Sequence, residues 1–314
     1  MSRAPGPAPV VLTVGEALID VVVAPDGAQE EHVGGSPANV AIGLAALGHP
    51  SRLTAHLADD ERGRRIRAHV EGYGVQLTPG SVGAERTSTA TAHLDDEGVA
   101  TYDFDLTWRV GEQDLDGVVH VHTGSIAATL EPGGSAVVDL AARARMEDAT
   151  VSYDPNCRPT IMGRPEDTRQ RIEEGVGRSD VVKASVEDLE WLYGYAPTQD
   201  VVREWGRLGP LLVVVTRGGD GLLVHVPTLE ETVELPARQV DVVDTVGAGD
   251  SFMAGLLSGL LDAGLLGSGA ARERLRTATL TDLAPALERA VATATWTVGR
   301  AGAAAPGRAD LDRS

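Results

Sequence analysis

Short apolar runs alternate with helical patterns along most of the chain, and this alternation limits the possible folds more than any other feature of the sequence. An apolar run at residues 10–14 and a second predicted strand at 51–57 are each followed by a helical pattern, at 37–47 and 61–73. The alternation continues to a fully apolar run at 211–216. Strands joined by helices are parallel, and helices then cover the sheet. The sequence therefore predicts an α/β fold built on a large parallel sheet.

Residues 86–108 interrupt that alternation. Two β-rich segments, at 87–94 and 99–106, are separated by the hairpin-turn signal Asp95-Asp96-Glu97-Gly98. Together with residues 18–23 they predict a small sheet beside the main domain, with a polar face over a cleft, as in a lid. The alternative is a surface hairpin that extends the main sheet.

The chain shows no internal repeat or low-complexity linker. We therefore expect a single domain over residues 1–314, with a lid formed by residues 18–34 and 86–108. Residues 264–282 are rich in Arg and Thr and show little periodicity, so we expect a loop or an irregular helix there.

Charge and composition argue against several classes of partner. The formal net charge of −19 would repel a phosphate backbone, and aromatic residues, at 4%, are too few for a base-stacking platform. The single cysteine, Cys157, permits no intrachain disulfide and suits a reducing compartment. The longest apolar stretch is interrupted by Asp262, and residues 1–9 lack a signal-peptide pattern. We expect a cytoplasmic protein that binds neither nucleic acid nor a membrane.

Lysine occurs once, at Lys183, which excludes a Walker A loop because that loop needs a lysine directly after a glycine-rich turn. HExxH, GxSxG and His-Arg-Asp motifs are also missing from the sequence, so zinc proteases, α/β-hydrolases and protein kinases lose support. Any chemistry must be argued from glycines and carboxylates.

The strongest chemical signal is the run Asp244-Thr245-Val246-Gly247-Ala248-Gly249-Asp250, directly before an apolar helical pattern. Small residues at a helix N-terminus let backbone N–H groups approach an anion closely. A carboxylate in that turn would repel a phosphate, yet a general base there could take the proton of an attacking hydroxyl while the N–H groups stabilise the transferring phosphoryl group. The alternative is that Asp250 only caps the helix.

This run resembles the C-terminal signature of the PfkB, or ribokinase-like, family of carbohydrate kinases. The run Gly34-Gly35-Ser36-Pro37-Ala38-Asn39 resembles the N-terminal signature, and residues 15–20, 154–158 and 216–221 also match family segments, so the resemblance covers nearly the whole chain. It implies a three-layer ribokinase-like α/β fold with a β-sheet lid. It also implies transfer of the γ-phosphoryl group of ATP to a sugar hydroxyl.

The resemblance also implies roles for individual residues. Asp250 would be the general base, with an anion hole formed by Gly247, Ala248 and Gly249. Sugar contacts would come from Asp20, Gly34, Gly35, Asn39, Phe104 and Arg158. The nucleotide would lie against Lys183, Ser185, Thr216, Arg217, Gly218, Gly219, Gly221 and Gly249.

Several of these residues also have ordinary structural explanations. Asn39 could cap backbone groups at a helix start, and Arg158 could pair with a surface carboxylate. The glycine-rich segment 216–221 could be a plain hairpin turn.

The resemblance implies Mg²⁺ with the ATP and, in some members, a monovalent cation such as K⁺ near Asp244. Where many members carry Asn-x-x-Glu, this chain has Ser185-Val186-Glu187-Asp188. Asp188 could reach Mg²⁺ through water, but Glu187 and Asp188 could also be first-turn acids that the helix dipole favours.

Within the family, the order of motifs most resembles bacterial fructokinases. Kinases of 2-keto-3-deoxygluconate share several motifs but often carry Tyr-Tyr-Arg in the lid, where this chain has Tyr102-Asp103-Phe104-Asp105. Two acids there would repel a sugar acid, so we expect the substrate to be a neutral sugar, and fructose before other neutral sugars. Trp108-Arg109 could restore a positive group, which keeps the sugar-acid kinase or another PfkB sugar kinase as the alternative.

A catalytically silent sugar-binding regulator on the same fold is the non-enzyme alternative, and the intact Asp250 argues against it. An exposed apolar face on the lid would favour a homodimer formed through the lid.

Overall fold

The computed structural model describes residues 8–95, 97 and 100–313. The strands of its central sheet are β1 (Val10–Val14), β4 (Ser51–Thr54), β5 (Gln76–Leu77), β8 (Val118–Gly124), β9 (Thr150–Asp154), β10 (Val181–Ser185), β11 (Leu212–Thr216), β12 (Leu222–Val226) and β13 (Glu231–Leu235). Their order is β13-β12-β11-β10-β9-β8-β1-β4-β5. Neighbours from β11 to β5 pair in parallel, and β12 and β13 add an antiparallel hairpin at one edge. The expected large, mainly parallel sheet is confirmed.

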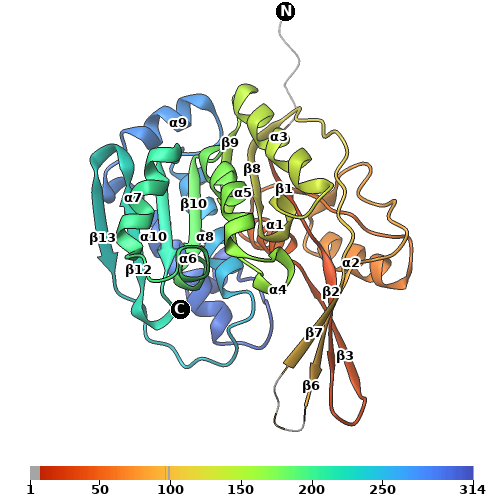
Figure 1. The fold of residues 1–314 in the computed structure, drawn as a ribbon. Coiled ribbons are helices and arrows are strands. Elements are labelled where there is room, and N and C mark those ends of the chain that lie inside the picture. The colour runs from red at the N-terminus through yellow and green to blue at the C-terminus, as the bar shows by residue number, and fades with distance from the viewer. Residues whose placement is uncertain (1–7, 96, 98–99, 314) are drawn as a thin grey trace, which may run out of the picture.

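Helices cover both faces of this sheet, which makes three layers (Figure 1). One face packs against α3 (Gly133–Met146), α5 (Pro165–Gly177), α6 (Val186–Tyr193) and α7 (Thr198–Leu208). The other packs against α1 (Ser36–Ala46), α8 (Ala248–Asp262), α9 (Gly269–Arg276) and α10 (Leu280–Val298). On β1, Leu12 joins the first core and Val11 the second, because successive strand residues point to opposite faces.

The remaining elements lie around this body. They are α2 (Glu61–Gly72), α4 (Pro159–Met162), α11 (Arg308–Leu311) and the 3₁₀ turns η1 (Ser125–Ala128), η2 (Gly218–Asp220) and η3 (Pro227–Leu229). None of the helices in the described ranges is long and apolar enough to cross a membrane.

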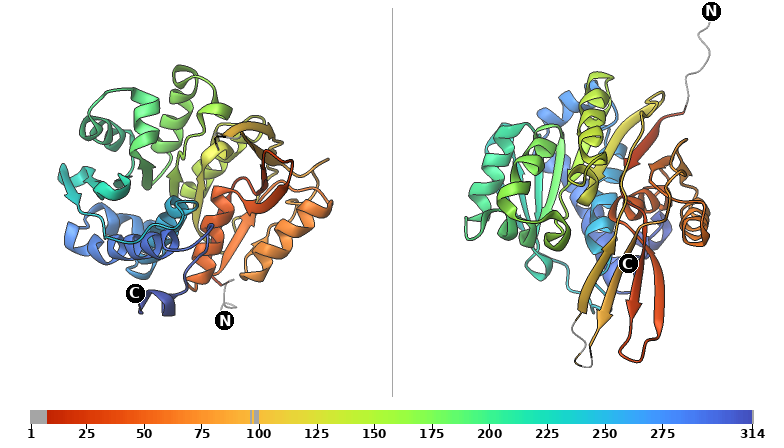
Figure 2. Two further views of the ribbon diagram at one scale, coloured as in Figure 1. Left: turned by 90° about the horizontal axis from the view of Figure 1, so that it is seen from below. Right: turned by 45° about the vertical axis from the view of Figure 1, so that its right-hand side comes forward.

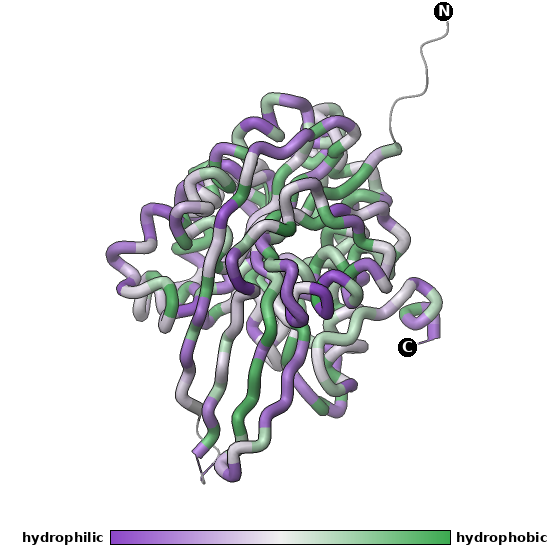
Figure 3. Tube along the Cα trace, turned by 90° about the vertical axis from the view of Figure 1, so that its right-hand side faces the viewer, coloured by the Kyte–Doolittle hydropathy of each residue, from purple (hydrophilic) through white to green (hydrophobic). Residues whose placement is uncertain are grey.

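A second, four-stranded sheet projects from the body (Figures 1 and 2). Its strands are β2 (Leu18–Val23), β3 (Gln29–Gly34), β6 (Thr89–Leu94) and β7 (Ala100–Asp105), in the order β3-β2-β6-β7. Residues 15–17 connect β1 of the main sheet directly to β2 of this one. Figure 3 shows the four strands side by side, with apolar and polar stretches among them. We call this sheet the lid.

The lid sheet is separate from the main sheet, so the alternative of a hairpin that extends the main sheet is wrong. Part of the predicted turn at residues 95–98 and most of residues 1–9 lie outside the described residues.

The expectation of a loop or irregular helix at residues 264–282 is wrong for the middle of this segment, which forms the regular helix α9. Ser268 caps this helix by accepting from the N–H of Ala271. Only Ala271 and Leu275 are buried on it, which is too few apolar positions to give a clear helical period.

Candidate active site

A cavity of about 550 Å³ lies between the lid, the carboxyl ends of the parallel strands and the start of α8. Open α/β sheets bind ligands at this edge. The lining includes eight of the residues that the sequence predicted: Asp20, Gly35, Asn39, Phe104, Arg158, Gly247, Gly249 and Asp250. Segments far apart in the chain therefore meet at one site.

Asp250 occupies the first turn of α8 and is buried. The hydroxyl of Ser36 donates to its Oδ1 at 2.6 Å, and the amide Nδ2 of Asn39 donates to its Oδ2 at 2.8 Å. Both donors come from the start of α1. The carboxylate is therefore held in one orientation at the cavity wall, and the N-cap residue of α8 is Gly247 rather than Asp250.

The loop before Asp250 needs small residues. Gly247 has a φ of 74°, in the left-handed region, and a Cβ there would lie 2.5 Å from the Cβ of Ala303. Ser251 N–H makes the first helical bond, to Gly247 O, and Ala248 N–H donates to Thr245 O at 3.2 Å. Gly247 and Gly249 of this turn both line the cavity.

Lys183 lies directly behind this turn. A Cβ added to Gly249 would be 3.0 Å from the Lys183 Nζ, which donates to Asp154 Oδ2 at 2.8 Å. Burial opposes charge on Lys183, but the nearby carboxylates of Asp154, Asp188 and Asp250 outweigh it and raise its pKa. The ammonium of Lys183, paired with Asp154, therefore lies next to Gly249.

The lid side of the cavity presents Asp20. Burial raises the pKa of this carboxyl, and the charges of Arg158 and His32 partly oppose the effect. A Cβ at Gly34 would lie 1.9 Å from Asp20 Oδ2, so Gly34 makes room for the carboxylate rather than lining the cavity itself. Arg158 donates to Asn156 Oδ1 at 2.7 Å and leaves part of its guanidinium toward the cavity.

The lid strand β7 does not turn its two acids toward the substrate, as the sequence had suggested. Tyr102 and Phe104 line the cavity, with their rings stacked 6.0 Å apart. Asp103 and Asp105 point to the opposite face, because strand residues alternate, and pair there with His93 and Arg86. The two acids therefore do not face a substrate, and repulsion by them gives no reason to expect a neutral sugar.

The pair Trp108-Arg109 does not supply a positive group to the cavity either. Trp108 is buried in the core and donates to Ala127 O at 2.8 Å, and Arg109 is exposed outside the lining. Among the described lining residues, the charged side chains are the carboxyls of Glu16, Asp20 and Asp250 and the guanidinium of Arg158.

Of the residues predicted to hold a nucleotide, Gly249 lines the cavity and Lys183 lies inside β10, and the others stand at the ends of the neighbouring strands β10 and β11 or directly after β11. Thr216 pairs with Ser185 in the sheet register, and Arg217 to Gly221 follow as a tight turn in which Gly218 and Gly221 have positive φ. Arg217 pairs with Glu234 at 3.1 Å. Apart from Gly249, these residues do not line the 550 Å³ cavity.

The two candidate ion ligands are both tied to the backbone. Asp188 Oδ1 accepts from Cys157 N–H and its Oδ2 accepts from Ser185 N–H, as part of a capping box on α6. Asp244 accepts from Val246 and Gly302 N–H, and these bonds lower the pKa of its carboxyl. Within the described ranges no three His, Cys, Asp or Glu side chains cluster tightly enough to hold a metal.

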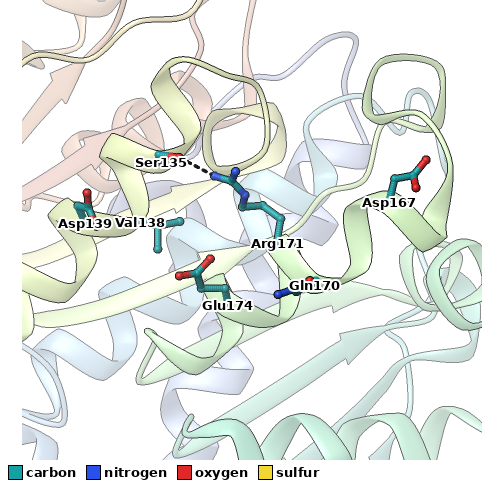
Figure 4. Close-up of a pocket in the computed structure, with 7 residues that line it drawn as sticks. All are labelled: Ser135, Val138, Asp139, Asp167, Gln170, Arg171 and Glu174. Carbon is teal, nitrogen blue, oxygen red and sulfur yellow. Dashed lines mark hydrogen bonds between the residues drawn. The ribbon is translucent and has the colours of Figure 1, made fainter.

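Another hollow, of about 390 Å³, lies between α3 and α5 (Figure 4). It contains none of the predicted site residues. Its cation, Arg171, donates to Ser135 and pairs with Glu131, so that charge is already compensated.

Ser36 and Glu16 belong to the cavity but were not among the predicted site residues. Both stand inside segments that match the family, next to Gly35 and Gly15, so the signal for them was present.

Comparisons with known proteins agree with this geometry. The family model described as pfkB family carbohydrate kinase matches residues 9–309. A fructokinase of Klebsiella pneumoniae is 33% identical over 81% of this chain and 85% of its own. A fructokinase of Xylella fastidiosa with bound ATP superposes with a TM-score of 0.84 at 27% identity, over 97% of both chains.

A double mutant of a Vibrio cholerae O395 fructokinase, with fructose, ADP and a potassium ion bound, gives a TM-score of 0.78 at 25% identity, over 98% of this chain and 99% of its own. The fold, the cavity with its buried aspartate and the family match lead to one conclusion: this chain belongs to the pfkB family and is a carbohydrate kinase.

Proposed function

We propose that this kinase transfers the γ-phosphoryl group of ATP to a hydroxyl of a neutral sugar, with fructose as the preferred substrate. The observation that carries the proposal is the position of Asp250, a buried carboxylate with both oxygens held, at the junction of the cavity and the glycine turn.

In the proposed reaction, Asp250 accepts the proton of the sugar hydroxyl as the sugar oxygen attacks the γ-phosphorus and the bond to ADP breaks. The backbone N–H groups of Gly247 and Gly249 stabilise the charge on the transferring group. Ala248 contributes less, because its N–H is partly engaged by Thr245 O. Lys183 lies next to this turn and is paired with Asp154.

The charges of the cavity support a neutral sugar. Without counting Glu16, the carboxyls of Asp20 and Asp250 still outnumber the single guanidinium of Arg158 in the described lining. A sugar acid would meet this excess with a single cation to compensate, whereas hydroxyl groups can donate to Asp20 and accept from Arg158. The names of the Klebsiella, Xylella and Vibrio relatives support fructose within this class.

ATP would occupy the strand ends beyond Gly249, against Ser185 and the turn from Thr216 to Gly221. The small residues of that turn fit a closely approaching phosphate or ribose. Mg²⁺, when bound with ATP, neutralises phosphate charge. Each Asp188 oxygen keeps a lone pair beyond its backbone bond, so this residue fits a water-mediated role rather than direct ligation.

Asp244 is our candidate for a monovalent cation. Its carboxylate joins the loop before Gly247 to the loop at Gly302, and both loops carry backbone carbonyls that could complete a ligand set. The potassium ion bound to the Vibrio relative supports this assignment.

We further propose a homodimer formed through the lid. The cavity-side face of the lid carries Val22, Ala92 and Tyr102 in register across its strands, and Tyr102 is 56% exposed. The lid extends past the helices of the body (Figure 2), so a second lid could cover these apolar groups. Light scattering after size exclusion tests this, and a monomer at micromolar concentration contradicts it.

The single cysteine and the use of ATP support a cytoplasmic location, which cell fractionation tests.

The direct test of function is ADP release with ATP and Mg²⁺ against fructose, tagatose, ribose, 2-keto-3-deoxygluconate and adenosine. The proposal expects the highest kcat/KM with fructose. Turnover with 2-keto-3-deoxygluconate alone would show that the substrate is a sugar acid and not a neutral sugar. Tight sugar binding without turnover would favour the catalytically silent regulator.

A further inference from the structure

Glu16 lies where the main sheet, the lid and the start of α8 meet. It lies in the three-residue connection from β1 to β2 and lines the 550 Å³ cavity, yet its side chain is almost completely buried, at 8% exposure. A Cβ at Gly35 would lie 2.4 Å from Glu16 O, so the backbone of the two signature segments packs tightly here. The position of Glu16 is therefore fixed by the fold.

One oxygen of this carboxyl has no partner. Within the described residues, Glu16 Oε2 is buried and makes no hydrogen bond. Burial raises the pKa of the carboxyl to about 7, although a hydrogen bond from Ser125, the backbone N–H of Glu16 and the charge of Arg158 all act to lower it. Burial therefore favours the protonated form of this carboxyl.

The residue that holds Glu16 is itself strained. Ser125 has a φ of 52°, a value that residues other than glycine rarely adopt. Backbone strain and unpaired buried polar atoms both destabilise a fold, and both occur preferentially at binding sites. Here they occur in contact with each other and on the wall of the same cavity.

We propose that Glu16 is a further substrate-binding residue of this kinase, whose protonated Oε2 donates a hydrogen bond to an oxygen of the sugar. This inference rests on the proposed function, because it takes the cavity to hold a neutral sugar. The unpaired atom then gains the partner that the protein does not supply.

The protonated form is the one that fits the surroundings. The charged groups that face Glu16 are Asp250 from α8 and Arg158 from the loop after β9, and Asp20 lines the same cavity from β2. Asp250 must be ionised to act as a base, so a second full negative charge beside it is unfavourable. A neutral acid keeps the hydrogen bond without that charge.

The test compares Glu16→Gln and Glu16→Ala with the wild type, using calorimetric binding of fructose without nucleotide from pH 6 to pH 8. Gln keeps a donor at this position and cannot ionise. We expect Glu16→Gln to bind within about threefold of the wild type at pH 6 and Glu16→Ala to bind about tenfold more weakly. Wild-type affinity should fall as pH rises through about 7, while that of Glu16→Gln stays level.

Two outcomes overturn the proposal. One is binding by Glu16→Ala within twofold of the wild type at pH 6. The other is a pH dependence of fructose affinity that persists unchanged in Glu16→Gln. Such a result would show that the pH dependence comes from Asp20 or Asp250. The control Glu71→Gln, on α2 outside the cavity, should alter neither affinity nor its pH dependence.

Ser125→Ala provides a second route if a Glu16 variant folds poorly. Loss of the Ser125 hydroxyl should weaken fructose binding in the wild type by about threefold and have no further effect in Glu16→Ala. Equal effects in both backgrounds contradict the proposal. The proposed function has its own test: it fails if the wild type turns over no sugar of the panel. If the wild type also binds none of these sugars, both the proposed function and the role of Glu16 are overturned.

Discussion

The Ser36 hydroxyl donates to Asp250 Oδ1 at 2.6 Å, although the two residues are 214 positions apart in the sequence. Each belongs to the first turn of a helix, Ser36 to α1 and Asp250 to α8, and these helices pack side by side on one face of the main sheet. Together with the bond from Asn39 Nδ2 to Asp250 Oδ2, this contact joins the two signature segments at the proposed base. The orientation of Asp250 therefore depends on α1 as well as on its own helix.

Ser36→Ala should lower kcat by about tenfold or more with little change in the KM for fructose, because a hydrogen bond to a charged group stabilises it by about 1.5–3 kcal/mol. The matched control is Ser51→Ala, whose hydroxyl bonds only to His49 O at 3.0 Å. Steady-state kinetics of both variants provide the check. A kcat within twofold of the wild type for Ser36→Ala would show that this contact does not orient the base.

Gly249→Ala should reduce kcat/KM for ATP by about tenfold to a hundredfold, because its methyl group would stand 3.0 Å from the Lys183 Nζ and beside the N–H groups of the turn. Gly72→Ala is the control, since its Cβ meets nothing within 4 Å. Kinetics with varied ATP, together with thermal unfolding, separate a local effect from misfolding. Unchanged kinetics in Gly249→Ala would argue against an anion hole at this turn.

Two neighbouring lid residues should behave differently. Phe104→Ala should raise the KM for the sugar by about tenfold, because Phe104 lines the cavity and its loss removes an apolar contact. Asp105→Ala should leave the KM for the sugar within twofold of the wild-type value, because Asp105 pairs with Arg86 on the opposite face. Equal effects of the two substitutions would contradict the lid geometry.

Asp262 links α8 to α10 and α11. Hydrogen bonds from Arg308 and Arg289 lower the pKa of its carboxyl from 3.8 to about 2. A lowered pKa stabilises the fold above the unfolded value near 4, and this stabilisation is lost as pH falls toward 2. Asp262→Asn should therefore cost about 1 kcal/mol of unfolding free energy at pH 7, allowing for solvent screening.

Urea unfolding at pH 7 and at pH 3 provides the measurement for Asp262→Asn. The difference between variant and wild type should shrink at the lower pH. A difference that stays constant with pH would show that the charge of Asp262 is not what stabilises this contact.

Much of the fold could be predicted because strands such as β11, buried on both faces, are continuous apolar runs in the sequence. The helix α9 could not, since only two of its residues are buried. The lid strand β7 shows a subtler limit. Its residues Asp103 and Asp105 alternate with Tyr102 and Phe104, and the sequence could not say which pair faces the cavity until the sheet register was known.

The site was predictable where a motif carried the residue and unpredictable where the role depends on a distant partner. Asp250 and Gly247 stand in a recognisable run, whereas the importance of Ser36 follows only from its contact with Asp250. Asp188 illustrates the reverse case. The resemblance left two roles open for it, a water-mediated contact with Mg²⁺ or an acid in the first turn of a helix, and the folded chain adds that both of its oxygens accept backbone N–H groups.

The central claim is that Asp250 acts as the base for a sugar hydroxyl. The most direct measurement compares ADP release by the wild type and by Asp250→Asn with fructose, ATP and Mg²⁺, alongside calorimetric binding of fructose to both. We expect kcat of Asp250→Asn to fall by at least about a hundredfold while fructose still binds within about tenfold of the wild-type affinity. A variant that keeps more than a tenth of the wild-type kcat would contradict it.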